Sequence, residues 1–388
     1  MRPAARLRLF YFVYYGAVGA NLPFFAAYLR GLGFTGEQIG TVQMVGPVVA
    51  PGVALAWATA ADRLGALSRA LALAALLSAA AAAFLPLART PLTLAAVVLA
   101  WSLAERAVVP LADAVTVEWA EANPPASYAR IRLFGSLGFI AAAQVVGLLL
   151  AARGDRPGDL LVPLVIAGCV AAYAAAARSL PAPPPLRAPR PRRADVAALV
   201  RDRRLLALLA ACAVHWVACA PFHLLFGVFV RDHGLPSSIT GLAMAVGVGA
   251  EVAALLAFPR FEPRLSSPAM LATAFGASAL RWGLLAGASS AGAIVALQLL
   301  HGLTFGIFWA TSMRALAGLV PAPLRATGQA LYTAVVFGGG NAAGYLLSGL
   351  GYDRLGGVGP LFTVASAVEA ALLLATVVAC FITRPPEN

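Results

Sequence analysis

The sequence predicts an all-α membrane protein whose twelve transmembrane helices form two bundles of six. Of its 388 residues, 61% are hydrophobic and only 11% are charged, whereas soluble proteins average roughly 25% charged residues. So few charges cannot cover a water-soluble surface, which excludes a soluble enzyme. Because one membrane span and its loop take roughly 30 residues, the chain has room for about twelve spans.

Twelve apolar runs follow one another along the chain, each bounded by charged residues or by proline and glycine. Each run is long enough to cross the hydrocarbon core as a helix. Their abundant alanine and glycine suit helices that pack closely in lipid. The first six runs cover residues 9–29, 38–61, 70–88, 91–117, 132–152 and 160–178. The second six cover residues 205–230, 238–258, 268–288, 291–313, 326–350 and 360–382.

The basic residues between the runs predict the orientation. All 28 lysine and arginine positions of the chain are arginines, two of which, Arg106 and Arg281, lie deep inside runs. With a cytoplasmic N-terminus, the inner segments carry twenty arginines and the outer loops carry six, which satisfies the positive-inside rule and places both termini in the cytoplasm. Arginines gathered at helix ends, without interleaved aromatics, predict no nucleic-acid partner. Arginine without lysine, beside so much alanine, indicates a GC-rich bacterial genome and therefore a bacterial inner (plasma) membrane.

One segment is too polar and proline-rich to span. Residues 179–204 read SLPAPPPLRAPRPRRADVAALVRDRR. Proline favours an extended chain, and arginine suits the anionic inner leaflet, so a solvated cytoplasmic tether is predicted, with a binding segment as the alternative. The predicted organisation is an N-terminal bundle over 1–178, a linker over 179–204 and a C-terminal bundle over 205–388.

The two halves share a repeated segment. Residues 25–40 (FAAYLRGLGFTGEQIG) align with residues 226–241 (FGVFVRDHGLPSSITG) at a constant offset of 201, so that an arginine and two glycines coincide. Each segment joins the first two spans of its half. Because six spans is an even number, both halves enter the membrane from the same side. This parallel repeat predicts a transporter with a substrate site at the repeat interface.

The loop between the second and third runs carries a recognisable signature. It reads ATAADRLGALSR from Ala58 to Arg69, which resembles the G-x-x-x-D-R-x-G-R-[RK] signature of the major facilitator superfamily. Asp62, Arg63 and Gly65 match, whereas an alanine replaces the leading glycine and one basic residue of the pair is missing. The resemblance covers the whole chain. It implies that Asp62 and Arg63 form a gate on the cytoplasmic side that breaks and reforms during alternating access.

A narrower resemblance appears in later spans. The segments PLADA (110–114), YARIRLFGSLGF (128–139) and QLLHGLTFG (298–306), together with charges in spans eight and nine, look like the phenylpropionic acid permease group. Members of that group are relatives of lactose permease and of nucleoside–proton symporters. The chain departs from lactose permease at Thr304, where that permease has a glutamate one turn after its histidine. A proton-release route copied from lactose permease is therefore not expected.

This narrower resemblance implies roles for five residues. It places Asp113 and Arg132 at the substrate site, and Glu251, Arg281 and His301 in substrate and proton handling. Asp113 could instead be an ordinary charge at the cytoplasmic end of its span. Arg132 competes with an arginine two residues earlier, which must face nearly the opposite way. We favour Arg132 for the cavity.

Charged residues inside the apolar runs point to the same site independently of the family resemblance. Each costs about 2.5–3.5 kcal/mol at the centre of a membrane, so these groups must face one another or a polar cavity. Glu251 and Arg281 are predicted to pair. The pair is either a permanent link between two spans or a coupling site, where substrate displaces the arginine and changes the proton affinity of the carboxylate. The six charged residues are Glu105, Arg106, Asp113, Glu251, Arg281 and Glu369.

The remaining polar residues have less certain surroundings. Glu105 is expected to be a second cavity acid or a packing partner, and not to pair with Arg106, since adjacent helical residues diverge. Gln298 shares a helix face with His301, which either titrates in the cavity or hydrogen-bonds a backbone carbonyl. Glu369 is expected to make a polar contact between helices.

Proline can kink spans one and seven and expose polar groups toward a cavity. Tyr14, Asn21, His215 and Phe222 are therefore expected to line it, with ordinary packing as the alternative. The four cysteines have no metal-ligand or disulfide spacing, and no metal or cofactor is predicted.

The sequence thus predicts a proton-coupled symporter, in the lipid bilayer and as a monomer, for a small organic solute. An aromatic carboxylate such as phenylpropionate is the first candidate, and a nucleoside or sugar is the second. A drug–proton antiporter of the same fold is the main alternative, and a transport-inactive sensor or assembly partner is a remote one. An enzyme is not predicted, because the chain lacks a nucleophile–base arrangement and a phosphate-binding loop.

Overall fold

A computed structural model describes residues 2–64, 67–181 and 199–382, and every regular element in these ranges is helical. The first half contains six helices and a short 3₁₀ turn, η1 (Leu85–Leu87). The helices are α1 (Pro3–Gly31), α2 (Gly36–Leu64), α3 (Leu67–Ala82), α4 (Pro91–Glu121), α5 (Tyr128–Ala152) and α6 (Leu161–Ala177). Each predicted apolar run of this half therefore corresponds to a helix, and the run 70–88 is shared by α3 and η1.

The second half contains four continuous helices and two composite runs. The continuous helices are α8 (Arg203–Asp232), α9 (Ser237–Phe261), α10 (Ser267–Ala286) and α15 (Val358–Ile382). One run joins α11 (Ala291–Ala296), the 3₁₀ segment η2 (Leu297–Leu300), the π-helical η3 (Gly302–Ile307) and α12 (Phe308–Leu319). After the turn η4 (Ala322–Leu324), the other joins α13 (Arg325–Tyr332), the π-helical η5 (Thr333–Gly340) and α14 (Asn341–Leu355).

Ten helices within the described ranges are long and apolar enough to cross a membrane. Two of the twelve predicted spans are not among them. Leu161–Ala177 is an apolar helix of only 17 residues, and the composite run Arg325–Leu355, which contains the π-helical η5, is the other. Large apolar side chains project outward, among them Leu92 at 81% and Leu256 at 72% exposure. Such a surface is suited to lipid and not to water.

Helix ends explain why most helices extend a few residues beyond the predicted runs. Polar residues at a terminus can continue a helix and satisfy its free N–H groups. The Thr90 hydroxyl accepts from the N–H of Thr93 in a capping box before Pro91, and Ser266 caps α10. Asp202, near the end of the predicted 179–204 linker, caps α8. Residues 182–198 of that linker lie outside the described residues.

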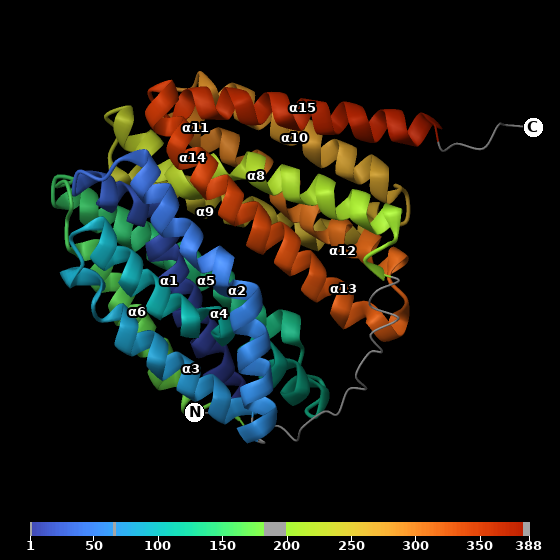
Figure 1. Ribbon diagram of the computed structural model, residues 1–388, viewed down its shortest axis with the longest axis horizontal. Helices are drawn as coiled ribbons and strands as arrows, with labels where there is room; N and C mark the ends of the chain where they lie inside the picture. Colours follow the sequence, from blue (N-terminus) through green and yellow to red (C-terminus); the bar gives the residue numbers. More distant parts are fainter. Residues whose placement is uncertain (1, 65–66, 182–198, 383–388) are drawn as a thin grey trace, which may run out of the picture.

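The helices gather into two groups that meet at one end. Figure 1 shows α1–α6 on one side and α8–α15 on the other, diverging toward the end where α13 lies. The main contacts between the groups are those of α1 with α8, α2 with α14, and α5 with α9. The last two pairs are equivalent under the sequence repeat, since α2 corresponds to α9 and α14 to α5.

The repeated segments have the same backbone features in both halves. Gly33 and Gly234 follow α1 and α8 with φ values of +90° and +68°, a conformation that favours glycine. A Cβ atom on Gly40 would collide with the carbonyl oxygen of Tyr345, and one on Gly241 with that of Ala143. Each coinciding glycine therefore either ends a helix or lets two helices of opposite groups approach closely.

Candidate functional site

Arg281 of α10 is the most deeply buried cation of the described chain, with 1% of its surface exposed. Its Nη1 lies 3.0 Å from His301 Nδ1 and donates to Thr304 Oγ1 at 2.9 Å, and its Nη2 donates to Gln298 Oε1 at 2.5 Å. All three partners are neutral or can be, and no described carboxylate forms an ion pair with the guanidinium. Its Nε has no hydrogen-bond partner within the described ranges.

Irregular helix geometry places these three partners. Gln298 lies in the 3₁₀ segment η2, and His301 separates it from the π-helical η3, which contains Thr304. A 3₁₀ helix has three residues per turn, so Gln298 and His301 are stacked and both face Arg281. Segments of π-helix are also common at functional sites, and they change the direction in which side chains point.

His301 separates Arg281 from Glu251, which the sequence predicted to be a direct pair. His301 Nε2 lies 3.7 Å from Glu251 Oε2, on the opposite side of the ring from Arg281. A guanidinium only donates hydrogen bonds, so Nδ1 accepts and Nε2 carries the proton of the neutral ring. The direct Glu251–Arg281 prediction is therefore wrong for the described residues. Thr304, at the position of the glutamate in lactose permease, supplies a hydroxyl to Arg281 instead of a charge.

Aromatic rings flank the guanidinium. Arg281 Cζ lies 4.4 Å from the ring centroid of Phe222 and 4.5 Å from that of Trp282. Phe222, predicted to line the cavity, also lies 5.9 Å from the His301 ring, centroid to centroid. Cation–π contacts of this kind stabilise a buried arginine without neutralising it. The charge thus remains available to an anion.

Acids and tyrosines form a second cluster, in the first half. The Tyr11 hydroxyl donates to Asp113 Oδ1 at 2.6 Å, and the Tyr14 hydroxyl donates to Glu105. Asp113 lies within α4, eight residues before its end, and not in a loop. Tyr11 was not predicted; only its position on the same face as Tyr14, three residues later, could have suggested it.

The surroundings of three other predicted residues of the first half are also clear. Arg132 lies over the ring of Tyr15, 3.8 Å from the centroid, whereas Arg130 is exposed. Glu105 and Arg106 do contact each other, with 3.5 Å between Oε2 and Nε. Their predicted separation is wrong, because two long side chains can fold toward each other from adjacent positions. Asn21 Oδ1 is buried without a hydrogen-bond partner in the described chain.

His215 does not line an open cavity. It is wholly buried in α8, and its Nδ1 lies 2.7 Å from Oε1 of Glu369 in α15, which is also wholly buried. Its cavity-lining prediction is therefore wrong, because a buried carboxylate nearby holds the ring inside the bundle. The predicted interhelical contact of Glu369 is thereby identified.

The predicted gate residues make no described contact. The Asp62 side chain lies outside the described residues, and Arg63 is exposed at the end of α2. The helix groups are instead joined at the opposite end, where two aspartates cross between them.

Each of these aspartates accepts hydrogen bonds from the N-terminus of a helix in the other group. Asp353 of α14 accepts from the N–H groups of Gly36 and Glu37 in α2, both at 2.8 Å. Asp155, between α5 and α6, accepts from the N–H of Ser237 in α9 at 3.2 Å. Its backbone carbonyl also accepts from Arg231 at 2.5 Å. Both interactions favour a negative charge at the positive end of a helix.

Asp155 adopts an unusual conformation at this contact. Its φ of 51° is the only positive value among the described residues other than glycine. Strained backbone of this kind is typical of switch regions. Sequence reasoning missed both aspartates, because an acidic residue in a loop or near a helix end carries no signal of a partner on a distant helix.

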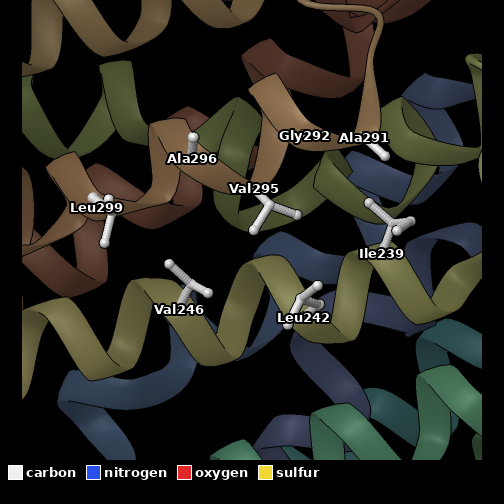
Figure 2. Close-up of a pocket in the computed structure, with 8 residues that line it drawn as sticks. All are labelled: Ile239, Leu242, Val246, Ala291, Gly292, Val295, Ala296 and Leu299. Carbon is white, nitrogen blue, oxygen red and sulfur yellow. The ribbon is translucent and has the colours of Figure 1, made fainter.

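A separate hollow of about 460 Å³ lies on the outer side of α9 and α11. Figure 2 shows that aliphatic side chains line it, including Ile239, Leu242, Val295 and Leu299. Leu299 is 63% exposed. The hollow has no hydrogen-bonding side chain, so it suits a lipid chain and lacks the groups of the site around Arg281.

Known proteins resemble the chain over nearly its full length. The family described as "MFS_1 like family" matches residues 4–364. The "Maltose permease" of Geobacillus stearothermophilus is 28% identical over 373 residues, 94% of this chain and 92% of that protein. The "Probable 3-phenylpropionic acid transporter" of Escherichia coli (strain K12) is 28% identical over 360 residues, 90% and 91% of the two chains.

The fold also matches solved structures. The nucleoside transporter NupG superposes with a TM-score of 0.87 at 17% sequence identity, covering 99% of this chain and 100% of that one.

Proposed function

Because the chain belongs to the MFS_1 like family, we propose that it is a secondary active transporter that carries a small organic anion across the membrane together with a proton. It is a multi-pass membrane transporter and not an enzyme. The observation that carries the proposal is Arg281, a wholly buried cation whose described partners are uncharged. Such a charge in a membrane span is costly, and a substrate carboxylate would compensate it.

The proposed topology has twelve spans with both termini in the cytoplasm of a bacterial cell. The ten long apolar helices, the short helix Leu161–Ala177 and the composite run Arg325–Leu355 together supply twelve. The arginine distribution supports this orientation. The chain then divides into bundles over 1–178 and 205–388, joined by the 179–204 linker, and acts as a monomer in the inner membrane.

The substrate we propose first is an aromatic carboxylate. Phe222 and Trp282 beside Arg281 offer ring faces for an aromatic group, and the unpartnered Nε offers a further donor to a carboxylate. A relative named for 3-phenylpropionic acid supports this class. The relatives named for maltose and nucleosides support a sugar or nucleoside as the second candidate.

The proposed proton coupling passes through His301. While Arg281 donates to Nδ1, that nitrogen cannot take a proton. A substrate carboxylate that draws Arg281 away would free Nδ1, and the resulting imidazolium would then face Glu251 through Nε2, 3.7 Å from Oε2. Substrate binding would thus raise the proton affinity of the His301–Glu251 pair. Asp113, Arg132, Glu105 and Gln298 complete the proposed substrate and proton site.

The proposed transport cycle is alternating access. Contacts between the groups lie at the end of Asp155 and Asp353, and the groups diverge toward the end where α13 lies (Figure 1). Because the proposed topology places the start of α13 in the cytoplasm, this is an inward-facing arrangement. Asp62 and Arg63, at the diverging end, are then expected to engage in the outward-facing state.

The test is solid-supported-membrane electrophysiology on proteoliposomes with an inward proton gradient. Concentration steps of 3-phenylpropionate, a nucleoside and a disaccharide are applied in turn. We expect a current for 3-phenylpropionate that Glu251→Gln abolishes. Matched proteoliposomes with Glu121→Gln, an exposed acid at the end of α4, serve as the control. Silence for all three solutes, with protein that melts cooperatively, would contradict the proposal.

A further inference from the structure

A second buried titratable pair lies outside the site described above. His215 and Glu369 are each wholly buried, with Nδ1 and Oε1 2.7 Å apart. Cys219 Sγ lies 3.6 Å from the other ring nitrogen of His215. The rings of Phe308 and Phe275 enclose the imidazole, with centroids 4.0 and 5.5 Å away. The pair is thus held in an apolar core and has no role in the proposed transport steps.

The pair is neutral only while it holds one proton in addition to the imidazole N–H. That proton makes either an imidazolium–carboxylate or an imidazole–carboxylic acid pair, and both carry no net charge. Loss of the proton leaves one negative charge in an apolar interior, which is costly unless a positive charge compensates it. Oε2 of Glu369 has no hydrogen-bond partner among the described residues, and Oε1 has, besides His215, the weak thiol donor of Cys219 at 4.0 Å, so little there stabilises a free carboxylate.

The cation whose charge reaches this cluster is Arg281 of α10, which acts on Cys219 and His223. On α8, Cys212, Cys219 and His223 are the other titratable groups around His215. The other elements packed here present neutral groups: aromatic rings from α10 and α12, and Gly340 and Gly344 where η5 and α14 meet α8.

Trp282 lies between the two sites. Its ring is stacked under the Arg281 guanidinium at 4.5 Å, and its indole lies near the Glu369 carboxylate without a well-aligned hydrogen bond. One aromatic layer therefore separates the cation from the pair.

We propose that His215 and Glu369 form a second proton-binding site whose occupancy depends on whether Arg281 holds an anion. With Arg281 free, its positive charge offsets a deprotonated pair. A substrate carboxylate bound to Arg281 cancels that charge, and the pair then takes a proton from water and becomes neutral. Anion and proton binding are linked through charge balance, with no direct contact between them. This inference rests on the proposed function, since it needs an anionic substrate at Arg281.

The test measures the affinity for 3-phenylpropionate as a function of pH in purified protein. The slope of log Kd against pH reports the protons taken up with each substrate molecule. We expect Glu369→Gln and His215→Gln to lower this slope by up to about one proton, while exchange of labelled 3-phenylpropionate across proteoliposomes, without a proton gradient, continues. Glu121→Gln is the matched control and should leave the slope unchanged.

The outcomes separate the two proposals. An unchanged slope in folded Glu369→Gln protein overturns the second proton site alone. A wild-type protein that neither binds nor exchanges 3-phenylpropionate overturns the proposed function, and this inference with it. If both variants fail to fold, infrared difference spectra of Glu251→Gln/His301→Gln protein decide. A substrate-induced carboxylic acid or imidazolium band that persists without these two residues supports the second site, and its absence overturns it.

Discussion

The two aspartates that cross between the helix groups give the sharpest prediction about the transport cycle. Asp353→Ala removes the acceptor of two N–H groups at the start of α2, and Asp155→Ala removes the acceptor at the start of α9. Helix α2 keeps its own cap, because Thr35 accepts from the N–H of Gln38. Helix α9 has no local side-chain cap, so the loss of stabilising free energy is expected to be larger for Asp155→Ala.

The magnitude follows from the bonds that are lost. Removing an N-terminal cap costs about 0.5–2 kcal/mol, and the exposed position of Asp353 places it at the lower end. Together the two changes should disfavour the present state by about 1–3 kcal/mol, which is a shift of about 5–150-fold in the equilibrium between states. The state in which this end is open becomes more populated, because the free N–H groups of its helix ends can form hydrogen bonds with water instead.

The assay is a distance measurement between spin labels at Arg156 and Leu355. Both residues are exposed, and they lie on opposite groups at the closed end. We expect the double variant to populate longer distances. The matched control is Asp159→Ala, which removes an aspartate that caps α6 within its own group, through the N–H of Leu161.

The control should lower thermal stability and leave the distances unchanged. A double variant whose distance distribution matches the wild type would refute the role of the two aspartates. A control that shifts the distances as far as the double variant would show that any lost cap at this end has the same effect.

Three further predictions concern single positions. Arg281→Lys should raise the Kd for 3-phenylpropionate about tenfold or more, because a lost charge-assisted hydrogen bond is worth about 1.5–3 kcal/mol; isothermal titration checks this. Gly227→Ala should lower the melting temperature, because its Cβ would collide with the carbonyl oxygen of Pro23, whereas Gly249→Ala, with open space around it, should not. Arg153 holds the pKa of the Asp159 carboxyl below its usual range, so its stabilisation is present above about pH 4 and lost at lower pH. Asp159→Asn should therefore melt below the wild type at pH 7 and match it in acid, as measured by differential scanning fluorimetry across pH.

The apolar runs predicted the helices well, because a membrane span has to be continuous and apolar for physical reasons. They could not predict the π-helical segments η3 and η5, since a π-helix depends on tertiary packing and not on hydropathy. The repeat was also visible, because glycines that permit close helix approach cannot be replaced easily. Gly40 and Gly241 illustrate this, each lying against a backbone carbonyl of the opposite group.

The partners of charged residues were harder to predict than their positions. The sequence singled out Glu251 and Arg281 as intramembrane charges and suggested that they pair, but the rotation of each helix decides which side chains meet. His301 lies between them because η2 and η3 turn it there. Glu369 met His215 for the same reason. Periodicity fixes the face of one helix, whereas a pair requires the relative rotation of two.

The two halves of the chain are equivalent at the end where Asp155 and Asp353 lie, and different at the central site. At the closed end the halves remain equivalent: an aspartate of each group holds the first turn of a helix in the other, which is what a two-fold opening and closing motion requires. In the centre they are not equivalent. The first half has carboxylates held by tyrosines, and the second has a buried arginine with uncharged partners. An anion that binds the arginine changes the charge balance of one half only. In the proposed alternating-access cycle, the symmetry of the aspartate contacts and the asymmetry of the site would therefore allow one motion to be driven by the charge of a single bound solute.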